Sequence, residues 1–193
     1  GKNNITVDYG TTIAVSGNVV TISGVTFTGT PTTKTTQYTY HFSKWSVTNG
    51  ATVTGNLTVT ASFTRTVNNY DVTIKVSPSG YGSLTHTKVE SVPYGTTLSV
   101  NGNKLTINTT TPTTVTATPT PADAQYTYKF DSWTNGTATV KGSTEVIANF
   151  SRTVNTYAVI WKSQDGSKTY ETDPAVEYGK APSYDASTPT KDR

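Results

Sequence analysis

The feature that most constrains this chain's fold is an internal repeat with a period of about 85 residues. The segment at residues 37–45 (QYTYHFSKW) returns at residues 125–133 (QYTYKFDSW), 88 positions later. The segment at residues 63–70 (FTRTVNNY) returns 87 positions later as FSRTVNTY. Self-similarity at a period of this size indicates successive copies of one structural unit. The chain must therefore fold as tandem modules and not around one large core.

The repeat predicts three segments along the chain. Residues 1–67 form a first unit, residues 68–154 a complete second unit, and residues 155–193 the N-terminal part of a third. The first unit lacks a counterpart of the strand expected at residues 70–76, which predicts an open sheet edge there. The third unit supplies that strand at residues 157–161, from Tyr157 to Trp161, without partners of its own. We expect this strand to pair with an incomplete edge in another molecule or by folding back, or to be poorly ordered.

Within each unit, apolar and polar residues alternate. Residues 38–42, 57–63 and 70–76 show this period of two, and so do their copies, which is typical of half-buried strands. Trp45 leaves the alternation by one residue, which predicts a bulge or a strand end just before it. Residues 98–100 and 105–107 flank Asn-Gly-Asn and predict a hairpin. The one short helical turn that the sequence offers lies at residues 121–124.

Composition agrees with an all-β chain. The sequence has 44 threonines and only 4 leucines, so long amphipathic helices are excluded on supply alone. We predict tandem small antiparallel β modules, β-grasp-like or β-sandwich-like, with little or no helix.

With no cysteine there are no disulfides or thiolate ligands. A net charge of +3 without a basic stripe argues against a nucleic-acid partner, and no apolar run predicts membrane insertion.

Candidate chemical groups are few. His41 has Lys129 at its repeat counterpart and is interpreted as a solvated strand residue, and His86 has no carboxylate at short spacing, so neither predicts a catalytic triad. The densest acidic cluster combines Glu171, Asp173 and Glu177, and we interpret it as solvated charge on a hairpin. Neither pattern predicts a catalytic site, a cofactor site or a metal site. The sequence thus predicts a chain that is not an enzyme.

Aromatic residues offer the one candidate for ligand contact. Trp45 and Trp133 recur at matching positions beside tyrosine and phenylalanine, which suits either core anchors or a surface that stacks on sugars. We favour core anchors, because a tryptophan that returns once per repeat is the largest group available to a thin core. Tyr81 lies between glycines and is the aromatic that we expect to be most exposed.

The progression of aromatic and turn positions resembles a known family. Residues 70–82 (YDVTIKVSPSGYG), then YGTT at 94–97, YKFDSW at 128–133 and VIANF at 146–150, resemble a divergent B repeat of the internalin-B type. Residues 157–166 (YAVIWKSQDG), followed by VEYGKAP at 176–182, resemble the sister Listeria–Bacteroides repeat. The resemblance implies tandem, β-grasp-like modules of large secreted or wall-attached bacterial proteins. The Thr/Pro-rich stretch at residues 109–124 departs from it, since a helix stands there in the family.

These observations together predict a function. We expect a non-catalytic repeat region of an extracellular, cell-surface or wall-attached protein that acts as a stalk or spacer and presents a distal binding domain. Its partners would be neighbouring repeats of the same chain. The alternative is an adhesin module that binds carbohydrate or host protein through exposed aromatics. A third reading is an accessory domain attached to a glycoside hydrolase.

Overall fold

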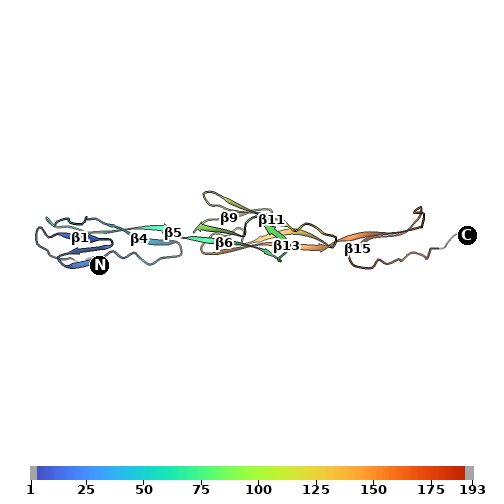
Figure 1. The fold of residues 1–193 in the computed structure, drawn as a ribbon, viewed down its shortest axis with the longest axis horizontal. Helices are drawn as coiled ribbons and strands as arrows, with labels where there is room; N and C mark the ends of the chain where they lie inside the picture. The colour runs from blue at the N-terminus through green and yellow to red at the C-terminus, as the bar shows by residue number, and fades with distance from the viewer. Residues whose placement is uncertain (1–3, 190–193) are drawn as a thin grey trace. The chain divides into compact units, whose positions relative to one another are not determined.

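A computed structural model describes residues 4–189 of the chain. All regular secondary structure in this part of the chain is β-strand, so the predicted all-β fold is confirmed. The strands form five sheets. Figure 1 colours the chain by residue number from blue to red. In sheet order they are β1 (Ile13–Ser16), β2 (Val19–Ile22) and β3 (Val25–Thr28); β4 (Tyr38–Trp45) and β5 (Ala61–Val67); β12 (Tyr126–Thr134), β13 (Thr144–Val154), β6 (Asn69–Ser77) and β8 (Lys88–Pro93); β7 (Gly82–Leu84), β11 (Thr113–Pro119), β10 (Lys104–Ile107) and β9 (Leu98–Asn101); β14 (Thr156–Lys162) and β15 (Thr169–Glu177).

The chain divides into two compact units. The first comprises the chain up to Tyr70 together with Pro93–Gly95, and the second comprises Asp71–Val92 and the chain from Thr96 onward. Residues 155–189, assigned above to a third repeat, thus group with the second repeat.

The first unit is built on the meander β1-β2-β3 and the hairpin-like pair β4-β5. Ile13, Val20 and Ile22 form its buried cluster, because alternate residues of β1 and β2 point to one face. Trp45, at the end of β4, packs against this cluster together with Val59.

The second unit contains two four-stranded sheets. In the first of them, β13 pairs with β12 antiparallel and with β6 parallel. In the second, β10 pairs with β9 and with β11, which confirms the hairpin predicted around Asn101-Gly102-Asn103. Buried residues of both sheets meet in a cluster of Ala117, Ala148 and Phe150. A Cβ added at Gly82 on β7 would overlap the Phe150 ring, so glycine there permits the close approach of backbone and ring.

The predicted alternation is present in β6, where Val72 and Ile74 are buried and Lys75 is exposed. The irregularity predicted before Trp45 is also present. The β4–β5 register shifts between Phe42 and Lys44, and the β12–β13 register shifts between Phe130 and Ser132. A shift at the same repeat position in both pairs re-aims each tryptophan toward its own core.

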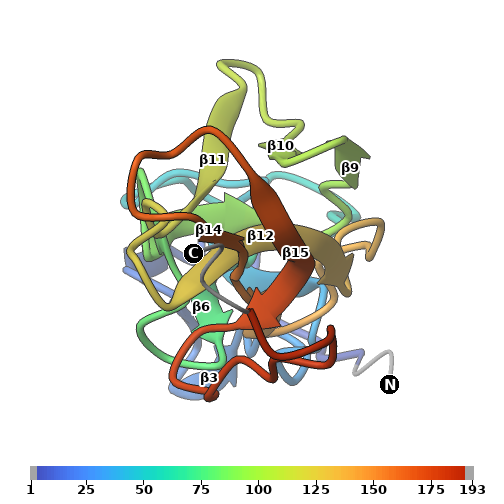
Figure 2. The ribbon, with the colours of Figure 1, turned by 90° about the vertical axis from the view of Figure 1, so that its right-hand side faces the viewer.

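Three sequence-based expectations need correction. Residues 121–124 form no helical turn, and the chain there only leads into β12. Residues 57–60 lie outside β5, although the equivalent residues 144–147 belong to β13. The strand at Tyr157 to Trp161 does have a partner in its own segment, because β15 pairs with β14 along one edge (Figure 2). The sequence missed β15 because its alternation is interrupted by Asp173 and Pro174.

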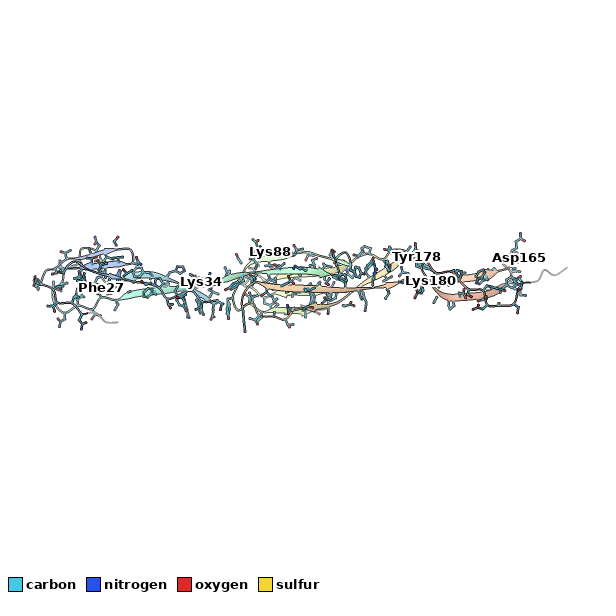
Figure 3. All side chains as sticks on the ribbon, turned by 90° about the horizontal axis from the view of Figure 1, so that it is seen from below. Phe27, Lys34, Lys88, Asp165, Tyr178 and Lys180 are labelled. Atoms are coloured by element: carbon cyan, nitrogen blue, oxygen red, sulfur yellow. The ribbon has the colours of Figure 1, made fainter. Side chains whose placement is uncertain are left out.

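The turn that joins β14 to β15 is organised by Asp165 (Figure 3). Its carboxylate accepts hydrogen bonds from the Ser163 hydroxyl at 2.6 Å and from the Ser167 backbone N–H at 3.1 Å. These bonds, first of all that from Ser163, lower the pKa of Asp165 to about 2. Hydrogen bonds to the ionised form favour that form, which gives the direction of this shift.

We predict that Asp165 titrates near pH 2 in the folded chain, measured from its side-chain carboxyl carbon by NMR. Its contribution to stability is then complete above its unfolded pKa of about 3.8 and disappears as the pH falls toward 2. Ser163→Ala removes the largest cause and should move the titration toward 3.8. An unchanged titration in this variant would contradict the assigned cause.

Candidate functional site

Two asparagines occupy the point where one repeat ends and the next begins. Asn68 lies between β5 and β6, and Asn155 lies between β13 and β14. Each stands in the Arg-Thr-Val-Asn-x-Tyr stretch that the sequence repeats after 87 residues. Asn68 is the one polar residue among residues 4–189 in the buried class, with 8% of its surface exposed. A buried amide needs hydrogen-bond partners, and both Asn68 and the half-buried Asn155 have them.

In the first unit, all four polar groups of Asn68 are engaged. Its backbone N–H donates to the Gln37 carbonyl at 2.9 Å, and its carbonyl accepts the Tyr94 N–H at 2.8 Å. Its side-chain oxygen accepts the Thr39 hydroxyl at 2.6 Å. Its side-chain amide donates to the carbonyls of Thr35 and Thr36 at 2.7 and 3.0 Å. The Asn68 side chain thus ties the start of β4 to the end of β5.

In the second unit, Asn155 makes the corresponding bonds, with one amide acceptor in place of two. Its backbone N–H donates to the Gln125 carbonyl at 2.8 Å, and its carbonyl accepts the Tyr178 N–H at 2.9 Å. Its side-chain oxygen accepts the Thr127 hydroxyl at 2.7 Å, and its amide donates to the Asp123 carbonyl at 2.7 Å. We call the hydrogen bonds of Asn68 the first junction network and those of Asn155 the second junction network.

A tyrosine that follows each asparagine by two residues adds one more bond. The Tyr70 hydroxyl donates to the Thr36 carbonyl at 2.6 Å, and the Tyr157 hydroxyl donates to the Ala124 carbonyl at 2.6 Å. An arginine on the preceding strand also stacks on a tyrosine in each case. The guanidinium of Arg65 lies 4.1 Å from the centre of the Tyr38 ring, and that of Arg152 lies 3.8 Å from the centre of the Tyr126 ring.

Sequence analysis used these stretches to establish the repeat but did not single out Asn68 or Asn155. The available signal was that Val-Asn-x-Tyr returns in both copies. A short connection of five residues tolerates many other sequences, so its return indicates a structural role. Asparagine suits the position because its amide can donate and accept toward the backbone at once. What the sequence could not give was the distant partners at residues 35–39 and 123–127.

The tryptophans named by the sequence are packed against cores. Trp45 lies 5.7 Å from Phe42 between ring centres, and Trp133 lies 5.5 Å from Phe130. Both indole N–H groups are buried without a hydrogen-bond partner among the described residues. This geometry favours core anchors over a ligand platform, since a platform presents its ring face to solvent.

Tyr81 differs from its expected exposure. The ring is half-buried, packs against the cluster of Ala117, Ala148 and Phe150, and makes an edge contact with Tyr128 at 5.3 Å. The flanking glycines do not leave it without neighbours, because β12 provides one. The most exposed large aromatic of the described chain is instead Tyr9, with 83% of its surface exposed.

The remaining candidate groups have local roles. His41 and His86 are exposed and lie within 3.3 Å of the threonine hydroxyls of Thr66 and Thr85. In the acidic cluster, the Glu171 carboxylate accepts the backbone N–H groups of residues 185 and 186, each at 2.8 Å. The sequence did not predict that Glu171 binds the backbone of the segment that follows β15. Residues 4–189 contain no group of three or more acidic or histidine side chains placed to hold a metal ion.

Exposed ion pairs connect neighbouring strands. The Lys88 ammonium on β8 (Figure 3) lies 2.8 Å from the carboxylate of Asp71 on β6 and 2.8 Å from that of Glu90. The hydrogen bond from Lys88 lowers the pKa of Asp71, and those to Asp71 and Glu90 raise the pKa of Lys88. All three groups are solvated, so these pairs contribute little to stability.

Comparisons of the chain with protein-family models, with curated proteins and with solved structures gave no match in any of the three. The resemblance to internalin-B-type and Listeria–Bacteroides repeats therefore stays a prediction. The described residues include no helix that is long and apolar enough to cross a membrane.

Proposed function

We propose that this chain is a non-catalytic repeat region of a large extracellular bacterial surface protein, where it acts as a spacer that presents a distal binding domain. The observation that carries the proposal is the recurrence of the junction network. The same asparagine uses the same backbone and side-chain atoms at the same repeat position in each unit. A feature that returns at every junction serves the joining of repeats.

The physics of a spacer requires such joints. In a tandem array each module contacts only its neighbours, so reach grows with copy number only if the junctions resist bending. A flexible linker of the same length would let the modules reorient. The second junction network replaces that freedom inside the second unit, because Asn155 bonds to the residues that precede β12 and to the residue that follows β15. Absence of cysteine and methionine supports an extracellular setting, since these are the side chains that oxidise most readily.

Replacing Asn155 with alanine tests the joint. The second junction network fixes β14 to the end of the β12–β13 pair, so we expect backbone ¹⁵N relaxation to give residues 156–178 the same correlation time as residues 126–154 in the unmodified chain. In Asn155→Ala, residues 156–178 should show a shorter correlation time and lower order parameters. The hydrogen bond from the Tyr157 hydroxyl alone is too weak to hold β14 in place.

Asn149→Ala is the matched control. Asn149 lies on β13, and its amide bonds to the hydroxyls of Ser132 and Thr134 away from the junction. This variant should leave the motion of residues 156–178 unchanged. Independent tumbling of these residues in the unmodified chain would contradict a stiff joint and with it the spacer.

Tryptophan fluorescence separates the spacer from a carbohydrate- or protein-binding adhesin. A spacer predicts blue-shifted emission that iodide does not quench and that a panel of soluble glycans leaves unchanged, because the indole N–H groups are buried. Quenchable emission that a glycan protects would favour the adhesin.

A further inference from the structure

The first and last strands of the complete second repeat lie next to each other. The repeat comprises residues 68–154, so β6 is its first strand and β13 its last. The two strands lie side by side (Figure 1) and pair over six residues, from Val72 with Thr144 to Ser77 with Asn149. Tension that passes along the chain through this repeat therefore enters at β6 and leaves at β13.

The direction of this pairing decides how tension loads it. Because β6 and β13 run parallel, the chain enters at one end of the paired segment and leaves at the opposite end. A pull on the chain then acts along the strands and loads all the hydrogen bonds between them at once. If the first and last strands were antiparallel, entry and exit would lie at the same end, and the hydrogen bonds would open one after another.

The connections to this pair of strands are short on both sides. One residue, Asn68, separates β5 from β6, and one residue, Asn155, separates β13 from β14. Both residues are held by the hydrogen bonds of the junction networks. Tension therefore reaches β6 and β13 directly. The chain between Ser77 and Thr144, which includes β7 to β12, stays off the load path as long as β6 and β13 remain paired.

Side chains shield the boundary between β6 and β13 on one face. Four residues that face the core there are at most 1% exposed, namely Val72, Ile74, Val146 and Ala148. Water thus has little access from this side to replace a hydrogen bond between the strands. On the other face, the Lys75 ammonium and the Glu145 carboxylate form an ion pair across the boundary. That pair is solvated and adds little, so the backbone hydrogen bonds and the buried face provide most of the resistance.

We propose that the β6–β13 pairing is a mechanical clamp that lets the second repeat carry tension without unfolding. The clamp rests on the proposed function, since a spacer that is held at one end and pulled at the other is loaded along its chain. It also goes beyond that function, because a spacer needs only length and stiffness. The force at which the clamp opens depends on the barrier to unfolding along the pulling direction and not on the overall free energy of unfolding.

Single-molecule force spectroscopy on the full chain tests the clamp through the direction of the load. The chain has no cysteine, so two introduced thiols fix where the pulling handles attach. Asn69→Cys combined with Thr153→Cys places the handles at opposite ends of the β6–β13 pair, and both positions are exposed. At the same loading rate, we expect an unfolding force about twofold or more above that of the control geometry.

Asn69→Cys combined with Lys141→Cys is the matched control. Continuing the strand register places the exposed Lys141 opposite Asn69, so both handles lie toward the end where Thr144 meets Val72. The load then acts across the same boundary and separates one residue pair after another. Equal unfolding forces in the two geometries would overturn the proposal.

The clamp and the spacer fail in different measurements. Equal unfolding forces would remove the clamp but leave the stiff joint, which the ¹⁵N relaxation of residues 156–178 reports. Independent tumbling of those residues would contradict the spacer, while the two pulling geometries would still differ if β6 and β13 form a clamp.

Two buried substitutions separate resistance to force from stability. Val146→Ala shortens a side chain at the boundary, opposite Ile74, and Leu105→Ala shortens one on β10, away from it. Urea unfolding should show the larger loss of stability for Leu105→Ala, because more buried volume is removed. The unfolding force between residues 69 and 153 should nevertheless fall in Val146→Ala and stay unchanged in Leu105→Ala, since the contacts of β10 are intact when the clamp opens. A larger fall in force for Leu105→Ala would show that resistance does not lie at the β6–β13 boundary.

Discussion

Replacing Phe150 with alanine is expected to lower the free energy of unfolding of the second unit by about 3–5 kcal/mol. The ring is 4% exposed, meets Phe130 edge-on at 5.5 Å, and lies directly against Gly82 of the other sheet. Truncation leaves a cavity between two sheets whose strands are fixed by their hydrogen bonds and can close only in part. Urea unfolding, followed by the NMR signals of the Val72 and Ile74 amides, reports on this unit alone.

The first repeat supplies the matched control. Phe63 holds the same repeat position and meets Phe42 in the same edge-on geometry, but 44% of its surface is exposed. Phe63→Ala should therefore cost about 1 kcal/mol, measured from the Ile13 and Val20 amides. Equal losses for the two variants would mean that the difference in burial between the repeats is absent in solution.

Replacing Trp133 with alanine is expected to cost the second unit about 3 kcal/mol or more. Its indole packs against the cluster of Ala117, Ala148 and Phe150 and contacts the Phe130 ring at a tilted angle. A tryptophan held for ligand contact would give the opposite result, because ligand platforms are solvated and their loss leaves stability nearly unchanged. The same variant should leave the chain's response to glycans unaltered.

Phe130→Leu keeps an apolar group beside Trp133 and serves as its companion variant. We expect it to cost less than Trp133→Ala, since a substitution that retains most of the volume lets the core repack. A Trp133→Ala chain that unfolds at the same urea concentration as the unmodified one would contradict the anchor assignment. It would return Trp133 to the candidates for ligand contact.

Much of the fold follows from residue patterns. Alternation in residues 70–76 predicted β6, and the displaced phase of Trp45 predicted the register shift before it. Local chemistry suffices there, since side chains of a strand alternate between two faces whatever lies beyond them. The failures are also physical. Residues 57–60 alternate like residues 144–147, yet only the latter form a strand, because β6 pairs with them. An alternating pattern shows that a segment can pair but not that a partner is present.

In the candidate site, too, some features followed from the sequence and others only from the tertiary structure. The sequence by itself determined the repeat, its period and the all-β fold, because each depends on residue order within one segment. The tertiary structure decided that Asn68 and Asn155 join strands about 30 residues apart in the chain, and that Tyr81 is covered by β12. It also decided that β15 completes one edge of β14. Contacts of this kind depend on which segments the fold brings together, and that information belongs to the whole chain rather than to any one stretch of it.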